Sequence, residues 1–181
     1  MLLGLVGSEM CIRDRRFHYK ESVGDDLFRR SIYAFWRRSV APTAFFDASK
    51  RRTCQVRTIR TNTPLHALTL LNDKSVLASS YHLAKLTLNR PSDDSDRIRW
   101  LCRQILSRTP TDREVAVVKG ELQGLRTYYQ NEVLEAENLL VPLEPLTVGG
   151  GPRPDVPASE LAAWLLTAST LLNLDEAQTR E

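Results

Sequence analysis

The strongest constraint on how this chain folds is the recurrence of apolar residues at helical spacing. The clearest stripe occupies positions i, i+3, i+4, i+7 and i+8, and consists of Ile98, Leu101, Cys102, Ile105 and Leu106. This spacing places all five side chains on one face of an amphipathic α-helix. Because such a stripe must be covered, the segment predicts a helix packed into a core that other helices complete.

Helix start and stop signals surround further stripes of this kind. Residues 24–38 predict a basic amphipathic helix, and Pro64 after Thr63 predicts the start of another. Asn72 and Asp73 interrupt that helix, and Asp73 can cap a following one that ends before Pro91. Each boundary depends on a residue type that satisfies or removes backbone hydrogen bonds at a helix end.

The last third of the sequence predicts two more helices. Thr111 and Glu114 have the spacing of a capping box, and the helix after them is expected to run to about Asn138. Prolines and glycines then predict a linker over residues 139–157. A final helix carries an apolar stripe over residues 161–172, with Asn173 as its breaker, and its Trp164 is expected to pack on the Ile98–Leu101 stripe.

The fold class that follows is mainly α. We expect an irregular domain of about six helices, with a long basic loop over residues 41–60 and at most one short strand, where Cys54, Val56 and Thr58 alternate with polar neighbours. A length of 181 residues suits one domain of ordinary size. No run of about 18 apolar residues occurs, so no transmembrane helix is predicted.

Residues 1–15 are set apart from this fold. The stretch LVGSEMCIRD, residues 5–14, resembles a translated sequencing adapter, because ten consecutive codons of such an adapter encode it. The alternative is a genuine N-terminal strand. We therefore expect residues 1–15 to be an adapter-derived artefact and residues 16–181 to form the domain. No signal peptide is recognisable in the sequence.

The charge of the chain is unevenly distributed. Residues 16–60 hold eleven Lys and Arg against four Asp and Glu, whereas residues 61–181 hold twelve against sixteen. Such asymmetry is typical of a surface that binds a polyanion, or of two halves that neutralise each other across an interface. We favour the second interpretation, and no nucleic-acid-binding motif supports the first.

No catalytic or metal-binding motif occurs in the sequence. His18, His66 and His82 lack the spacing of a helical metal site. Cys54 and Cys102 match no zinc, haem or thioredoxin motif, and whether they pair is left open. A nucleophile elbow, a phosphate-binding loop and the C-x-x-C-H motif of covalent haem are also missing, so neither an enzyme activity nor a cofactor is predicted for these residues.

A basic cluster is the best candidate for a ligand site. Arginine side chains bind carboxylates and sulfates in bidentate fashion, so the cluster could hold an anionic polysaccharide. The structural alternative, which we favour, is that these arginines pair with acidic helices and fix the irregular segment to the core. The candidate ligand-binding residues are Asp47, Arg51, Arg52, Arg57, Arg60 and Asn62, accompanied by Lys50.

Three segments carry a family resemblance. DDLFRRSIYAFWRRSVAP (25–42), RTCQVRTIRTNTPLHALTLLND (52–73) and SELAAWLLTASTLLNLDEAQTRE (159–181) resemble the C-terminal end of a planctomycete and verrucomicrobial family, domain of unknown function 1553 (DUF1553). The resemblance covers residues 16–181. This sequence departs from the family pattern at His66, where Gln is usual, and at Lys74, where Pro is frequent. His66 weakens the capping box that Gln would complete behind Thr63.

The resemblance implies a context for the chain. Family members often carry an export signal and a c-type cytochrome-like domain upstream, so it implies a periplasmic or extracellular location and haem c in an upstream domain. We expect a structural or interaction module at the C-terminus of an exported, cytochrome c-linked multidomain protein, with the upstream domains as its partners. The alternative is a lobe of a polysaccharide-binding or polysaccharide-degrading protein that uses the arginine cluster.

Overall fold

Every regular element that the structure describes is helical. The structure is a computed structural model that describes residues 64–146 and 155–178. The chain divides into two units, Met1–Leu68 and Thr69–Glu181, and almost all described residues belong to the second. The elements are α1 (Pro64–Asn72), α2 (Lys74–Leu88), α3 (Asp94–Leu106), α4 (Asp112–Asn131), α5 (Val133–Leu140), the 3-10 helix η4 (Glu144–Leu146), α6 (Ala158–Leu172) and α7 (Asp175–Gln178).

These elements confirm the mainly α fold class. The described ranges hold seven α-helices, close to the number expected, and contain no strand. Residues 24–38 and 41–60, for which a helix, a long basic loop and a short strand are predicted, lie outside the described residues. None of the helices in the two described ranges combines the length and the hydropathy that crossing a bilayer requires.

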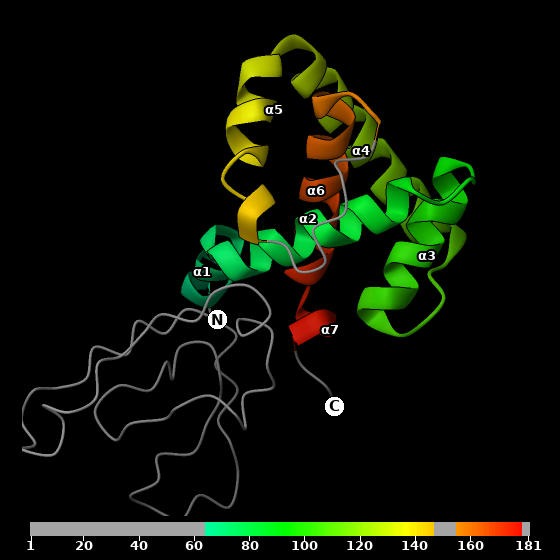
Figure 1. Cartoon of the computed structure of the whole chain (residues 1–181). Coiled ribbons are helices and arrows are strands. Elements are labelled where there is room, and N and C mark those ends of the chain that lie inside the picture. Colours follow the sequence, from blue (N-terminus) through cyan, green and yellow to red (C-terminus); the bar gives the residue numbers. More distant parts are fainter. Residues whose placement is uncertain (1–63, 147–154, 179–181) are drawn as a thin grey trace, which may run out of the picture. The chain divides into compact units, whose positions relative to one another are not determined.

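Helix α6 forms the centre of the second unit. Nine of its fifteen residues are buried, so it is covered on nearly every side. Helices α2, α4 and α5 pack against it, and Figure 1 shows α6 enclosed among them. Trp164, near the middle of α6, is fully buried. A helix buried in this way contributes mainly apolar area to folding, and the surrounding helices supply the polar surface.

Helix α3, which carries the Ile98–Leu101 stripe expected to cover Trp164, provides only part of the surroundings of Trp164. Trp164, Ile98 and Leu101 belong to one core cluster, as predicted. However, α6 packs more extensively against α2 and α4 than against α3. Small buried residues explain the close packing with α2, because Ala84 on α2 and Ala163 on α6 allow the two backbones to approach.

The predicted helix boundaries after Pro64 are confirmed where they depend on capping. Asp73 is the N-cap of α2, and its Oδ1 accepts hydrogen bonds from the backbone N–H groups of Ser75 (2.8 Å) and Val76 (3.2 Å). Thr111 and Glu114 form the capping box of α4: Thr111 Oγ1 accepts from Glu114 N at 3.3 Å, and Glu114 Oε2 accepts from Thr111 N at 2.7 Å. Asn173 is the C-cap of α6.

The prediction that one helix runs from Thr111 to about Asn138 is wrong. Helix α4 ends at Asn131, and Glu132 leaves the helical conformation with φ −116° and ψ 62°. The chain turns there, and α5 returns along α6 (Figure 1). Tyr129, Ala136 and Ala162 form a small buried cluster, so packing on α6 favours the turn. A straight helix would carry Ala136 away from α6.

The predicted linker begins too early. Residues 139 and 140 belong to α5, and Leu140 is fully buried. After α5, Leu143 is also buried, and residues 144–146 form η4. Leu140 and Leu143 therefore hold the first part of the predicted linker, residues 139–157, against the core.

Replacement of Trp164 tests the central position of α6. We expect Trp164→Ala to lower the free energy of unfolding by about 3–5 kcal/mol, because it leaves a cavity in the core. Chemical denaturation of the full chain measures the loss. Trp164→Phe is the matched control: it keeps most of the apolar volume and should cost clearly less. A loss below about 1 kcal/mol for Trp164→Ala would contradict the central role of α6.

Candidate functional site

The ligand-binding residues predicted from sequence lie outside the described part of the chain. The site made by Asp47, Arg51, Arg52, Arg57, Arg60 and Asn62 therefore stays a prediction. Among the residues that the structure describes, no three His, Cys, Asp or Glu side chains lie close enough to hold a metal ion. Cys102 is a buried free thiol, and burial raises its pKa, so it is poorly suited to nucleophilic chemistry.

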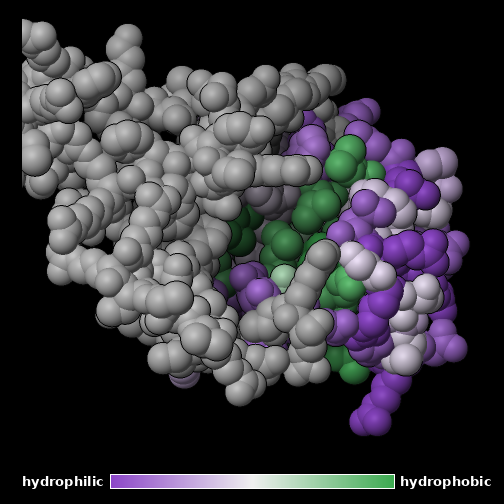
Figure 2. All heavy atoms as spheres, turned by 90° about the horizontal axis from the view of Figure 1, so that it is seen from below, coloured by the Kyte–Doolittle hydropathy of each residue, from purple (hydrophilic) through white to green (hydrophobic). Residues whose placement is uncertain are grey.

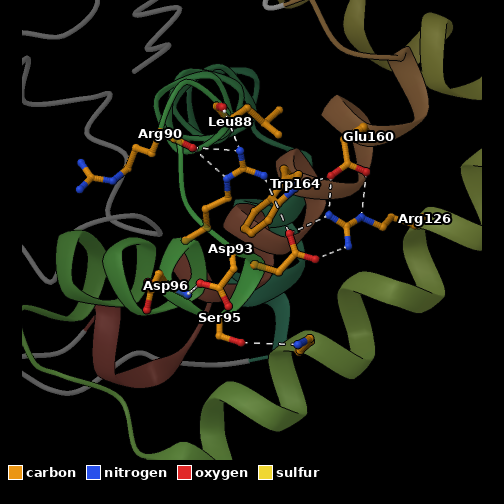
Figure 3. Close-up of polar contacts among 11 residues, drawn as sticks. Leu88, Arg90, Asp93, Ser95, Asp96, Arg126, Glu160 and Trp164 are labelled. Atoms are coloured by element: carbon orange, nitrogen blue, oxygen red, sulfur yellow. Dashed lines mark hydrogen bonds and ion pairs between the residues drawn. The ribbon is translucent and has the colours of Figure 1, made fainter.

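A different arginine organises the described helices. The guanidinium of Arg126 on α4 binds Asp94 with Nη1 and Nη2, at 2.5 and 3.0 Å. It also binds Glu160 with Nε at 2.8 Å and with Nη2 at 2.5 Å. The indole N–H of Trp164 donates to the same Glu160 carboxylate at 2.9 Å. In Figure 3, dashed lines join Arg126 to Glu160, and Trp164 lies beside them.

Helix ends position this cluster, which we call the Arg126 cluster (Asp94, Arg126, Glu160 and Trp164). Asp94 and Glu160 lie in the first turns of α3 and α6, where the helix dipole favours negative charge. Arg126 reaches both from α4. The three charged side chains are only 21–26% exposed, so the cluster joins three helices in a largely buried setting.

The electrostatics of the cluster indicate a structural role. Hydrogen bonds to Asp94 and Glu160 raise the pKa of Arg126, and the hydrogen bond from Arg126 holds the pKa of Asp94 below its usual value. A general acid or base needs a pKa near the working pH, and these shifts move both groups away from it. Arg126 also lies over the Trp164 ring, 5.9 Å from its centroid.

Sequence reasoning missed the Arg126 cluster. Arg126 is separated from Asp94 by 32 residues and from Glu160 by 34, so no local spacing reveals the contact. One weak signal existed. Arg126 is the sole Lys or Arg between Lys119 and Arg153. A lone cation on a helix in an acidic stretch is a candidate for a tertiary ion pair.

A second arginine connects the start of α4 to α7. Arg108 binds Glu114 with Nη2 at 2.6 Å and with Nη1 at 3.1 Å, and it also pairs with Glu176 on α7. The hydrogen bond from Arg108, helped by those from Thr111, lowers the pKa of Glu114 to about 2. These side chains are about 40% exposed or more, so solvent screens the pairs and each contributes little to stability.

The loop between α2 and α3 is fixed by a third arginine. Arg97 donates to the carbonyl oxygen of Leu88 at 3.3 Å and to that of Arg90 at 2.9 Å (Figure 3). The side chain of Arg90 lies over the Trp100 ring, 5.0 Å from its centroid. The two hydrogen bonds from Arg97 bind carbonyl groups at the end of α2 and just beyond it, and the contact of Arg90 with Trp100 also holds the loop.

The described surface also exposes large hydrophobic side chains. Figure 2 shows hydrophobic side chains gathered on one face of the described helices, with hydrophilic ones beside them. Four exposed hydrophobic residues lie at the end of α4, on α5 and at the C-cap of α5: Tyr128 (49% exposed), Val133 (51%), Leu134 (79%) and Val141 (57%). We call Tyr128, Leu134 and Val141 the α5 outer surface; Val133 is seven residues from the buried Leu140, so it lies on the inner side of the helix. An apolar patch rimmed by polar groups is typical of an interaction site.

Removal of Arg126 tests its structural role. We expect Arg126→Met to lower the free energy of unfolding by about 2–3 kcal/mol, because two partly buried carboxylates then lose their cation. Arg103→Met is the matched control, since Arg103 is exposed and makes one long hydrogen bond, to Thr109 at 3.4 Å. It should change stability by no more than about 0.5 kcal/mol. Equal effects of the two variants in urea denaturation would refute the role of Arg126.

Acid should weaken the same contacts. The folded pKa of Asp94 lies below its unfolded value of about 3.9, so its stabilising effect is complete above that pH and is lost as the pH falls through the folded value. For Glu114 the loss runs from pH 4.5 down to about 2. Urea denaturation between about pH 5 and 2 measures the slope. Asp94→Asn should flatten it, and an unchanged slope would contradict the contribution of Asp94.

Comparison with known proteins identifies a family. A family model described as PSD1, protein of unknown function (DUF1553), matches residues 4–122. The match begins inside the segment interpreted as adapter-derived and ends at Leu122, so the boundaries 1–15 and 16–181 stay predictions. The chain matches no curated protein and no solved structure. Because the family model covers more than half of the sequence, the chain belongs to the DUF1553 family.

Proposed function

We propose that this chain is a structural or interaction module at the C-terminus of an exported, cytochrome c-linked multidomain protein. The observation that carries the proposal is the α5 outer surface, where Leu134 is 79% exposed although the helix beneath it is firmly packed. Exposed apolar side chains on a well-packed helix suit the binding of another protein surface.

The charged groups near the core support the same proposal. Asp94 and Glu160 are the partly buried carboxylates of the Arg126 cluster, and one guanidinium binds both. A pair of acids in a glycosidase needs one protonated and one ionised carboxyl group facing a substrate. The hydrogen bond from Arg126 instead lowers the pKa of Asp94, and the same guanidinium binds Glu160, which favours a scaffold over a catalytic centre.

The location and the haem-bearing partner depend on the family resemblance. The chain belongs to DUF1553, and the motifs in residues 25–42, 52–73 and 159–181 suggest an exported protein with haem c in an upstream domain. Under this proposal the partners are the upstream domains of the same full-length protein. Haem would be attached at an upstream C-x-x-C-H motif, which residues 1–181 lack.

Expression of the full-length gene tests the proposal. We expect an upstream export signal and a C-x-x-C-H motif, and covalent haem that is retained in denaturing gels. Residues 16–181 expressed alone should carry no haem, because they lack the attachment motif. An upstream region without either feature would refute the cytochrome-linked context.

A polysaccharide assay separates the module from its alternative, a polysaccharide-binding or polysaccharide-degrading lobe. In the alternative, Arg51→Ala and Arg57→Ala would weaken binding or cleavage of anionic glycans, with little loss of stability. In the proposed module, Arg57→Ala should lower stability, because we expect its guanidinium to pair with the acidic helices. Salt-sensitive glycan binding that disappears in both variants would favour the alternative.

A further inference from the structure

Helix α7 is attached to the unit without burying any of its residues. It consists of four residues, and none of them is buried. A helix of this length is not stable by itself, because it forms too few hydrogen bonds to offset the cost of nucleation. Its position after the end of α6 (Figure 1) therefore depends on its contacts with the neighbouring helices, and it packs against α3 and α6.

Arg108, in the loop between α3 and α4, holds α7 by one carboxylate. Its Nε and Nη2 bind the two carboxylate oxygens of Glu176, with Nη2 to Oε2 at 2.8 Å, which is the bidentate geometry of a strong arginine–carboxylate pair. Its Nη1 and Nη2 also bind Glu114, and Glu114 accepts from the backbone N–H of Thr111 in the capping box of α4. The guanidinium is therefore positioned by α4, and Glu176 is the partner that the short helix contributes.

The helices beside α7 contribute buried side chains to the core. Cys102 on α3 is 2% exposed, Leu171 near the end of α6 is 4% exposed, and both belong to the main core cluster. Burial raises the pKa of the Cys102 thiol, and the charges of Glu114 and Glu176 raise it further. The thiol thus lies within electrostatic reach of the carboxylates that bind Arg108. On this side, a segment without buried residues borders the core.

The contacts of α7 are of the kind that opens easily. Arg108 and Glu176 are 39% and 47% exposed, so water and salt screen their attraction. The hydrogen bond from Gln178 Nε2 to the carbonyl oxygen of Leu172, at 2.6 Å, is also exposed. Segments held by exposed polar contacts and few buried side chains open locally while the rest stays folded. Helix α6, with nine buried residues, has the opposite character.

We propose that α7 is a reversible cover on α3 and the end of α6, and that the pair between Arg108 and Glu176 sets how often it opens. In the closed state, Glu176 occupies the guanidinium that Glu114 holds in place. In the open state, α7 detaches, Cys102 becomes accessible to small molecules, and the other helices stay folded. Salt favours the open state because it screens the pair. The inference goes beyond the proposed function and does not depend on haem, export or the α5 outer surface.

Chemical modification of Cys102 measures the opening, because a buried thiol reacts only when it becomes accessible. The full chain is treated with N-ethylmaleimide, and mass spectrometry of its peptides follows Cys102 separately from Cys11 and Cys54. The rate should lie far below that of the denatured chain, and it should rise about two- to threefold between about 0.05 and 0.5 M salt. Cys102 serves in this experiment only as a probe of accessibility.

Protein variants assign the opening to the pair. Glu176→Gln keeps the size of the side chain and removes its charge, so it should raise the rate of modification about two- to fivefold and abolish most of the salt effect. Arg108→Met should act in the same direction. Arg108→Lys keeps the charge but loses the bidentate geometry, so its rate should be intermediate. Arg103→Met is the matched control, because Arg103 is an exposed arginine of α3, and it should leave the rate unchanged.

Urea distinguishes local opening from global unfolding. Local opening exposes little surface, so the rate at Cys102 should hardly depend on urea below the unfolding transition, whereas global unfolding would make it rise steeply. An unchanged rate in Glu176→Gln, a wild-type rate that ignores salt, or a steep dependence on urea at every concentration would overturn the inference. The upstream sequence, haem attachment and glycan assays decide the proposed function separately, and none of them depends on α7.

Discussion

The hydrogen bond from Trp164 to Glu160 is the contact on which the polar organisation of the unit depends. Burial of Trp164 contributes a large apolar area, but its indole N–H needs an acceptor. Glu160 supplies that acceptor, and its charge in turn needs a cation, which is Arg126. The remaining donors of Arg126 bind Asp94. Through Glu160 and Arg126, the buried ring of Trp164 is thus connected to Asp94. These contacts hold the first turns of α3 and α6 against α4.

Helix ends that depend on neighbouring residues could be predicted from the sequence. The caps Asp73 and Thr111 act on backbone groups two or three residues away, so their effect is encoded within one helical turn. The stripe on α3 was equally informative, because periodicity reports which face is buried. The mainly α class followed from these local signals alone. The predicted arginine site and the segments at residues 24–38 and 41–60 remain predictions.

Features that depend on tertiary contacts could not be read from the sequence. The break at Glu132 has no proline or glycine to mark it, and arises where the chain turns to keep Ala136 against α6. The Arg126 cluster joins residues more than thirty positions apart. Leu134 and Leu140 look alike in a list of apolar residues, but one is exposed and the other is buried. Only the turn after α4 decides which face of α5 is covered.

Because of the same turn, the side chains of α5 that stabilise the fold are different from those that are exposed and available for binding. Its inner residues, Ala136 and Leu140, are in contact with the core, so changes there alter the free energy of unfolding. Leu134 and Val141 lose little solvent exposure on folding, and their replacement should leave stability almost unchanged. The carboxylates at the starts of α3 and α6, Asp94 and Glu160, are bound by Arg126 and belong to the stabilising side of this division. Binding on α5 can therefore be altered by substitution without disturbing the helices that support it.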